Sequence, residues 1–455
     1  MDPDDYLNVL EQRPGWAILS TNIAWCFACP EPETTPAIVA KLQHALEALA
    51  SAFPWIAGQV INEGSDPSTK NTGVFKIVPK DSTPYILVKD HRQAPSVPSI
   101  HNLRQVGFAT KSLDQTLFAP RPNFSLDRSL LGHVLLVQAN IISGGLVLVF
   151  SGNHSVTDMT GLTQIVQWFD RACHNEAFTP EQLRVGNMPR RHLIPLLDST
   201  YQPGDEVSLQ MTPVPSIPGA NEKSDSTAEQ PRLRWETFAF QSTATRELKA
   251  RATATKTAAY VSTDDSLSAF LWQSLARVRI QRLGAAKTST VARACNARRF
   301  LDIPSTYPGL VQNTIYSKLS LGELAELPLG AVASVLRDPI TSDSPSVGFY
   351  TRAVATVLSR SADKGCLKVV AWLDRSSDLL LTSLTATEAY KQDFGLGLGR
   401  AEAVRLTDLM KFEGMTFCLP TEPSGEVTVA MCLREEDLVR LRADELFAQY
   451  GRYRG

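Results

Sequence analysis

The chain has 455 residues, of which 43% are hydrophobic and 20% are charged, and its formal net charge is −2. This length exceeds what one ordinary hydrophobic core supports, so we expect two folded domains, and the composition excludes a disordered chain. No run of Lys and Arg supplies the basic surface of a nucleic-acid-binding protein.

The chain ends and the apolar runs predict a cytoplasmic protein. Met1–Asp5 is acidic and lacks the features of a signal peptide, and Arg452–Gly455 is not a retention or peroxisomal signal. No apolar run approaches the roughly 18 residues of a membrane helix. Seven cysteines are an odd number, which is typical of reduced thiols. Cys26 and Cys29 have the spacing of half a zinc or redox site, but no second pair follows, so we interpret them as positions in an apolar stretch.

Helix and strand signals alternate in the first third of the chain. Thr35–Phe53 predicts a helix, because apolar residues recur at spacings of three and four. Trp55–Val60 then indicates a turn into a strand. Phe75–Val78 and Tyr85–Val88 are typical of further short strands.

The clearest pattern lies between residues 132 and 173. His133–Gln138 predicts a strand, and Ile141–Gly145 predicts the turn that follows it. Leu146–Phe150 is apolar on both faces, as a central strand is. A helix is expected from about Thr160 to Cys173, with an apolar face. The loop between this last strand and the helix contains a histidine and an aspartate.

A change of composition predicts the domain boundary. Pro195–Leu233 is rich in Pro, Ser, Gly and charge and has no apolar period, which indicates a linker or a long crossover loop. We therefore divide the chain into a first domain at 1–196, a linker at 197–232 and a second domain at 233–455. Thr263-Asp264-Asp265 then predicts the N-terminus of a long helix, where acidic residues are favoured.

His154 is the first candidate for chemistry, because it directly follows a buried strand. A neutral imidazole can accept the proton that an attacking hydroxyl loses near pH 7. Two other interpretations stay open at this stage. His154 could be a structural histidine bonded to the backbone, or it could form half of a metal site with Asp158, although no third ligand is evident nearby.

Two further segments are candidates for a role in the site. Asp393–Arg400 has glycines at alternate positions, in a spacing that is not the dinucleotide-binding one, and Asp393 is expected to lock this loop by side-chain to backbone hydrogen bonds. Thr290–Cys295 predicts a buried strand with Cys295 in the core, followed by Asn296 and Arg298. If Arg298 is buried, it needs a carboxylate partner, because an unpaired buried charge is costly.

Taken together, these segments resemble the BAHD acyltransferase superfamily, and within it the fungal branch that includes the trichothecene O-acetyltransferases. The matching pieces occur in the family's order over nearly the whole chain. They are Phe53–Gly58, His154 with Asp158, Ser262–Trp272, Asn296 with Arg298, Asp393–Gly397, and Val427–Ala430 through Glu435–Leu438.

The resemblance implies a fold and a reaction. The fold is α/β, with two domains similar to chloramphenicol acetyltransferase, each a mixed sheet flanked by helices, and a solvent channel between them. His154 would act as general base on an alcohol or amine acceptor that attacks an acyl-CoA, most simply acetyl-CoA, in a ternary complex. No acyl-enzyme, metal, nucleic acid or membrane is implied, and a monomer is expected.

The resemblance also assigns supporting roles. Ser262 and Thr263 begin a helix near the cofactor and are candidates for binding CoA, since a helix N-terminus favours phosphate. Structural support of the site is expected from Asp158, Arg298, Asp393, Gly395 and Gly397, with Asp158 paired to Arg298. Two residues depart from the commonest family pattern: Met159 stands where many members have glycine, and Leu396 where many plant members have tryptophan.

Other functions remain open from the sequence alone. Acetyl transfer to a secondary-metabolite hydroxyl is the leading hypothesis, and N-acyl transfer is its near neighbour. The same two-domain channel could instead shape a precursor for a CoA-independent cyclisation. A non-catalytic binding protein is the third alternative, and the joint presence of His154, Asp158, Arg298 and Asp393 argues against it.

Overall fold

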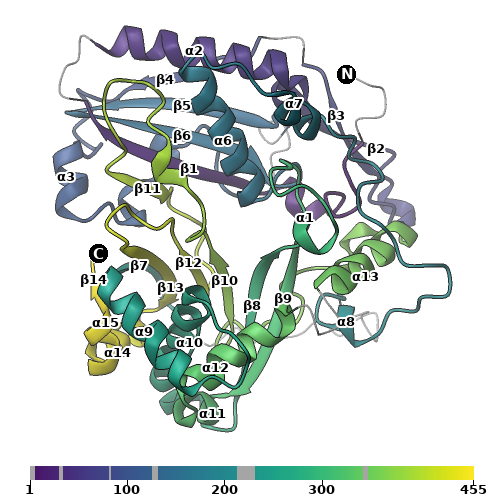
Figure 1. Cartoon of the computed structure of the whole chain (residues 1–455), viewed down its shortest axis with the longest axis vertical. Coiled ribbons are helices and arrows are strands. Elements are labelled where there is room, and N and C mark those ends of the chain that lie inside the picture. The colour runs from purple at the N-terminus through teal and green to yellow at the C-terminus, as the bar shows by residue number, and fades with distance from the viewer. Residues whose placement is uncertain (1–5, 30–33, 81–82, 126–131, 213–230, 342–346) are drawn as a thin grey trace.

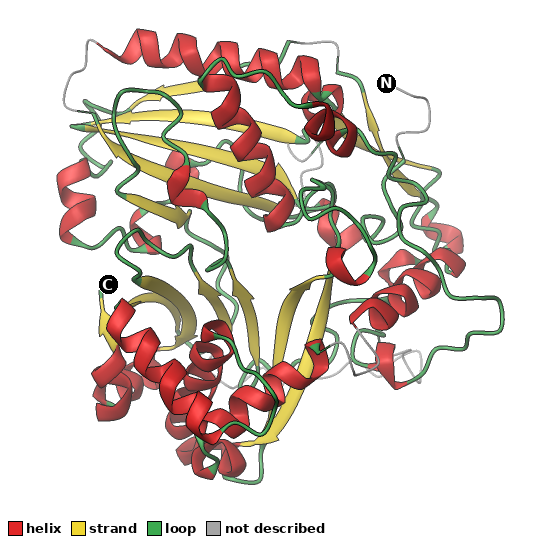
Figure 2. Ribbon diagram, in the orientation of Figure 1, coloured by secondary structure: helices red, strands yellow, loops and turns green. Residues whose placement is uncertain are grey.

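Two mixed β-sheets with helices packed on them form the frame of the molecule, one above the other in Figure 1. The computed structural model describes residues 6–29, 34–80, 83–125, 132–212, 231–341 and 347–455. The predicted α/β arrangement of mixed sheets flanked by helices is confirmed (Figure 2).

The first sheet has five strands in the order β11-β1-β6-β5-β4. Only β4 and β5 run parallel to each other, and the other neighbours are antiparallel. The strand bounds are β1 Ser20–Ala28, β4 Leu87–Asp90, β5 Leu135–Ile142, β6 Gly145–Asn153 and β11 Ala403–Leu406. The strand β6 lies in the middle of this sheet and is buried along its whole length, as its apolar sequence predicts.

Two long helices, α2 (Thr35–Ala52) and α6 (Met159–Cys173), pack against each other over this sheet (Figure 1). The apolar stripe predicted for α2 is buried, and it consists of Ile38, Leu42, Leu46 and Leu49. These side chains join one hydrophobic core with the apolar residues of α6 and β6. The helix α6 therefore packs on the central strand β6, and one loop connects the two elements.

The second sheet has seven strands in the order β14-β7-β13-β12-β10-β8-β9. The three strands β12, β10 and β8 are parallel to one another, and the remaining pairs are antiparallel. The bounds are β7 Leu233–Phe240, β8 Thr288–Asn296, β9 Gln312–Ser320, β10 Leu379–Ser383, β12 Met415–Cys418, β13 Val427–Arg434 and β14 Gly451–Tyr453. The helices α9 (Ser242–Thr255), α10 (Thr263–Leu283) and α12 (Leu329–Arg337) pack together on this sheet.

The chain crosses between the two sheets in a way that the sequence did not reveal. The strand β11 comes from the C-terminal half but pairs with β1, so that Ile23 lies opposite Leu406. Conversely, the N-terminal segment reaches the other half, where the Asn8 amide donates to the carbonyl of Leu310. The two halves are therefore joined by exchanged segments as well as by the segment between them.

The remaining elements are a small sheet and further helices. A two-stranded sheet pairs β2 (Gln59–Glu63) with β3 (Val74–Val78). The other α-helices are α1 Pro14–Ala17, α3 Ile100–Gln105, α4 Gln115–Phe118, α7 Pro180–Gly186, α8 Asp205–Ser208, α11 Leu321–Glu326, α13 Val347–Arg360, α14 Glu435–Ala443 and α15 Glu445–Tyr450. No helix in the described ranges combines the length and the apolar composition that crossing a membrane requires.

Some predicted bounds differ from the observed ones. The turn expected at 141–145 shrinks to Ser143 and Gly144, because β5 continues to Ile142 and Gly144 takes a φ of 71°. Such a two-residue hairpin turn needs a positive φ, which glycine adopts without strain. Cys295 was predicted to lie in the core but is only half-buried near the end of β8. Half of the predicted linker 197–232, residues 213–230, lies outside the described residues.

Candidate active site

His154 follows the end of β6 and is held by a tight turn. Asn153 closes this turn, since its side-chain Oδ1 accepts hydrogen bonds from the backbone and the hydroxyl of Ser155 at 3.0 and 2.7 Å. The backbone N–H of His154 donates to the carbonyl of Leu19 at 3.0 Å. The central strand and its neighbour therefore fix the backbone that carries the imidazole.

Of the two imidazole nitrogens of His154, one is hydrogen-bonded to a described residue and the other is not. Its Nδ1 lies 3.2 Å from the carbonyl oxygen of Thr157. Because a carbonyl only accepts, this contact assigns the proton to Nδ1 and leaves the lone pair on Nε2. No described residue forms a hydrogen bond with Nε2, and the Trp16 ring lies against the imidazole with 4.7 Å between ring centroids.

Burial lowers the pKa of His154 below its ordinary value of 6.5. The Asp158 carboxylate and the Thr157 carbonyl raise this pKa, but they do not outweigh the loss of hydration, and the Arg13 cation lowers it further. His154 is therefore neutral at pH 7, which is the form that can accept a proton.

Asp158 and Arg298 form a buried ion pair through two parallel hydrogen bonds. Both N···O distances are 2.9 Å. Asp158 also caps α6 by accepting from the Gly161 N–H at 2.8 Å, and it accepts from the Val311 N–H at 2.9 Å. Each carboxylate oxygen thus accepts two N–H groups, so the carboxylate has little capacity left for a metal or a substrate.

Arg298 is the centre of a second set of contacts. Its guanidinium donates to the backbone carbonyls of Tyr307 and Gly309, and the Asn296 side chain accepts from both its backbone and its Nη1. The predicted carboxylate partner for a buried Arg298 is thus present in the structure. The contacts of Arg298 and Asp158 therefore connect the segment 296–311 to the loop that carries His154.

A second buried pair, which the sequence did not suggest, supports the same loop. Arg190 Nη1 lies 2.7 Å from Glu11 Oε1 and also donates to the Val156 carbonyl at 2.9 Å. Glu11 accepts the backbone N–H of Leu310 at 2.9 Å. No spacing signal connects residues 11 and 190, since they meet only in the folded chain.

The glycine-rich loop after η8 (Ala389–Lys391) lies at the far end of α6. Asp393 Oδ1 accepts the Gly395 N–H and contacts His174 Nε2, both at 2.9 Å. The N–H of Phe394 donates to Asp170 at 2.7 Å. The 15 residues of α6 separate these contacts from His154 by about 20 Å at 1.5 Å per residue. Gly397 lies further along the loop with a φ of 74° and open space around it.

The two residues predicted to bind CoA lie where α10 begins. Ser262 is the N-cap, and its hydroxyl both accepts from the Asp265 N–H and donates to the Asp265 carboxylate. That carboxylate pairs in turn with Arg293 and Arg337. The Ser262 hydroxyl is thus committed to the cap, whereas Thr263 is exposed at the first helical position.

Other groups of potential metal ligands lie away from His154. Within the described ranges, Asp170, His174 and Asp393 have ligand atoms within 4.8 Å of one another, at the far end of α6. Cys26 and Cys29 belong to two different hydrophobic clusters, and burial raises the pKa of Cys26 to about 12. The Cys-x-x-Cys spacing therefore does not form a dithiol site.

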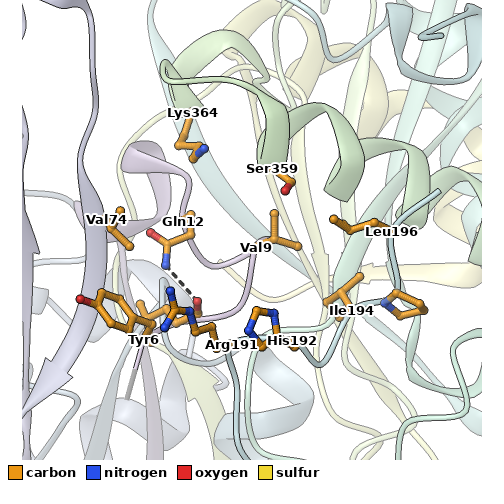
Figure 3. A pocket seen from close by; sticks show the side chains of 12 residues that line it. Tyr6, Val9, Gln12, Val74, Arg191, His192, Ile194, Leu196, Ser359 and Lys364 are labelled. Carbon is orange, nitrogen blue, oxygen red and sulfur yellow. Dashed lines mark hydrogen bonds between the residues drawn. The ribbon is translucent and has the colours of Figure 1, made fainter. Parts of the chain in front are cut away.

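A hollow of about 590 Å³ opens beside the N-terminal segment, and Figure 3 shows the side chains that line it. Tyr6, Gln12 and Arg191 lie at one end of this view, and Ile194 and Leu196 at the other. His154 is not among the lining residues. The hollow is therefore distinct from the surroundings of the imidazole.

Comparisons with known proteins match the chain from end to end. Residues 19–173 match the trichothecene 3-O-acetyltransferase-like N-terminal domain, and residues 122–447 match the transferase family. The chain is 41% identical to the O-acetyltransferase dmxR13 of Cryptosporiopsis sp., with 100% of this chain and 98% of that protein covered. It is 38% identical to the trichothecene 3-O-acetyltransferase TRI101 of Fusarium sporotrichioides, with 99% and 97% covered.

Solved structures agree with these matches. The structure of F. graminearum TRI101 complexed with coenzyme A and deoxynivalenol superposes with a TM-score of 0.92 at 35% identity, covering 99% of both chains. Vinorine synthase superposes with a TM-score of 0.66 at 14% identity, covering 98% of this chain and 93% of that one, which shows a shared fold alone.

Proposed function

Because this chain belongs to the transferase family, the BAHD acyltransferases that its motifs resemble, we propose that it moves an acetyl group from acetyl-CoA to a hydroxyl of a secondary metabolite. The protein is an acyl-CoA-dependent acyltransferase. Its relatives are named O-acetyltransferases, and solved structures of one of them hold coenzyme A together with a small toxin.

One observation carries the proposed mechanism: the hydrogen bond from His154 Nδ1 to Thr157 leaves Nε2 free to accept a proton. Nε2 takes the proton of the acceptor hydroxyl as its oxygen attacks the thioester carbonyl. The tetrahedral intermediate then collapses, the carbon–sulfur bond breaks, and the CoA thiolate receives the proton from His154. The acetyl group leaves as an ester, CoA leaves as a thiol, and the histidine returns to its neutral form.

The other candidate residues act through structure in this proposal. Asp158 and Arg298 hold the loop of His154 in place, and Asp393, Gly395 and Gly397 shape the loop at the far end of α6. Ser262 and Thr263 would lie near CoA, where the N–H groups at the start of α10 favour a phosphate. Since the Ser262 hydroxyl is used in the cap, Thr263 and the backbone are the donors left for a ligand.

The domains and the location follow the same reasoning. We assign residues 1–196 and 233–455 to two acyltransferase domains joined by the crossover segment 197–232, with the reaction in a channel between them. A monomer acting in the cytoplasm would meet the acyl-CoA pool there. The small-molecule acceptor and the acyl-CoA are its partners.

The test is an acetylation assay with purified full-length protein. Acetyl-CoA is offered with a panel of polycyclic alcohols and amines, and products are detected by the mass increase of one acetyl group while free CoA is measured with a thiol reagent. We expect acetylated alcohols from the wild type and from His44→Ala, an exposed control, and a loss of at least about a hundredfold in His154→Ala. Unchanged turnover in His154→Ala would refute the base, and turnover without acetyl-CoA would refute the acyl donor.

A further inference from the structure

Arg13 is a buried guanidinium that has almost no partner in the described structure. It is 4% exposed. Its one hydrogen bond joins Nη1 to the side-chain oxygen of Gln210 at 3.5 Å, which is at the limit of such a bond. The Nε atom is buried and has no acceptor. No described carboxylate forms an ion pair with Arg13. Its charge is met only by this long hydrogen bond and by the face of the Trp16 ring.

The other buried arginines make more hydrogen bonds than Arg13, although Nη2 of Arg279 also lacks a described partner. Arg121 also pairs with no described carboxylate, yet its three nitrogens donate to oxygen atoms of Ser151 and His133 at 2.7 to 2.9 Å. Each of the remaining ones among the described residues donates to at least two oxygen atoms, and they are Arg190, Arg279, Arg293, Arg298 and Arg405. A buried cation without such partners is costly, so its presence needs an explanation.

Arg13 lies beside the candidate base. It precedes the short helix α1, which Figure 1 shows between the two sheets. Its Cζ lies 5.2 Å from the centre of the Trp16 ring, and that ring lies 4.7 Å from the imidazole of His154. A small molecule whose hydroxyl contacts His154 is therefore long enough to extend past Trp16 to Arg13.

Two more unsatisfied N–H donors belong to the same chain of contacts. The indole Nε1 of Trp16 is buried without an acceptor, and so is the amide Nδ2 of Asn313 at the start of β9. Gln210 joins Asn313 to Arg13, since its amide donates to Asn313 Oδ1 at 2.9 Å while its oxygen faces the guanidinium. Arg13, Trp16 and Asn313 thus offer N–H groups that no acceptor in the described part of the chain receives.

The ionisable groups whose charges act on Arg13 include no carboxylate. They are the Tyr316 hydroxyl and the Cys366 thiol. The Tyr316 hydroxyl donates to the Val369 carbonyl at 2.7 Å, and burial raises its pKa, so it stays protonated. No group of the described residues neutralises Arg13, and an anion from outside the protein would do so.

We propose that Arg13, with Trp16 and Asn313, binds an anionic oxygen of the acyl acceptor, so that the enzyme selects hydroxy compounds that carry a carboxylate or an ionised phenol. This inference rests on the proposed acetyl transfer, because it names the class of alcohol that His154 deprotonates. The guanidinium supplies the charge, and the indole and amide N–H groups direct the oxygen. Charge-assisted hydrogen bonds of this kind are about twice as strong as neutral ones.

Calorimetry on the CoA-saturated full-length enzyme tests this proposal without requiring turnover. The probes are para-hydroxymethylbenzoate, its uncharged methyl ester, and para-hydroxymethyl-nitrophenol, whose phenol ionises near neutral pH. We expect the wild type to bind at least one anionic probe about tenfold more tightly than the ester. Preference for one anion identifies whether a carboxylate or a phenolate is the natural group.

The variants decide whether Arg13 is responsible. Arg13→Gln should abolish the preference for the anion, and Arg13→Lys should keep part of it, whereas the exposed control Arg191→Gln should leave it unchanged. Equal binding of ester and anions by the wild type, or no anion binding at all, overturns the proposal. A weaker affinity for CoA in Arg13→Gln also overturns it, because Arg13 would then serve the cofactor. Since the readout is binding, these outcomes are independent of the loss of turnover that tests His154.

Discussion

Asp158 and Arg298 lie 140 positions apart in the chain and form a bidentate ion pair, with both N···O distances at 2.9 Å. Both side chains are buried, at 3% and 1% exposure. The aspartate caps the helix that follows His154, and the arginine belongs to the segment that follows β8. The pair therefore joins the loop of the candidate base to the second half of the protein.

Removing one member of this pair should be costly. Arg298→Met leaves the Asp158 carboxylate buried with only backbone donors, so we expect the free energy of unfolding to fall by about 3–5 kcal/mol. The measurement is urea unfolding followed by circular dichroism. Arg299→Met is the matched control, because this neighbouring arginine is exposed and should change little.

The double variant Asp158→Asn/Arg298→Met separates the pair from its surroundings. We expect it to lose less stability than the two single variants combined, because no unpaired charge is left. Losses that simply add would show that the two residues stabilise the protein independently.

The pH dependence of activity should report the environment of His154. Its pKa lies below 6.5, chiefly because burial disfavours the charged imidazolium. The base acts only when neutral, so kcat/KM falls as the pH drops through this pKa, and we expect the acid limb of the profile below pH 6.5. An acid limb above that value would contradict the proposed environment.

The variant Arg13→Gln tests whether the charge of Arg13 lowers the pKa of His154. The Arg13 cation lowers the pKa of His154, so its removal in Arg13→Gln should shift the acid limb toward higher pH. The profile is measured with an uncharged acceptor so that substrate ionisation does not contribute. A shift toward lower pH would be inconsistent with a cation beside the imidazole.

Local sequence patterns predicted most of the elements that place the base. Apolar residues at spacings of three and four marked α2 and α6 to within a few residues, because burial of one helix face leaves a periodic signal. A continuous apolar run marked β6, because a central strand is buried on both faces. The requirement of a partner for a buried Arg298 pointed to a carboxylate. The choice of Asp158 among the carboxylates came from the resemblance to the family and not from spacing.

Contacts between distant segments could not be predicted in this way. The strand β11 joins the first sheet although it is only four residues long and far from β1 in sequence. Arg13 precedes a Pro-Gly pair, which reads as an ordinary turn, and nothing in that pattern shows that the guanidinium is buried beside His154. Glu11 and Arg190 are likewise recognised only when the fold brings them together.

The aromatic core around Phe394 should contribute strongly to stability. Phe394 is fully buried, and its ring contacts the rings of Trp25, Phe150 and Phe169. We expect Phe394→Ala to lower the free energy of unfolding by about 3–5 kcal/mol, as measured by urea unfolding. Leu396→Ala, two residues on and only half-buried, should cost clearly less. Equal losses of stability would show that the buried aromatic ring contributes no more than any other side chain of this loop.

Ser262 and Thr263 should separate stability from cofactor binding. Ser262→Ala removes the N-cap of α10, and we expect a loss of about 1 kcal/mol of stability. Thr263→Val keeps the cap but removes the free hydroxyl, so it should raise the KM for acetyl-CoA without lowering the melting temperature. An unchanged KM in both variants would remove these side chains from the CoA site and leave only the helix N–H groups as donors.

Gly161 allows α6 to approach the segment after β8 closely, so its replacement should disturb the site. A Cβ at this position would lie 2.0 Å from the backbone carbonyl oxygen of Pro308 and 2.4 Å from the Thr157 hydroxyl. Because backbone cannot move aside as a flexible side chain does, Gly161→Ala should shift the loop of His154 and lower both the melting temperature and kcat. Gly15→Ala is the matched control, since it adds the same methyl group where no atom lies within 4 Å. A fully active and stable Gly161→Ala protein would mean that the two segments can separate without moving the imidazole, which the shared contacts of Asp158 with Gly161 and Arg298 argue against.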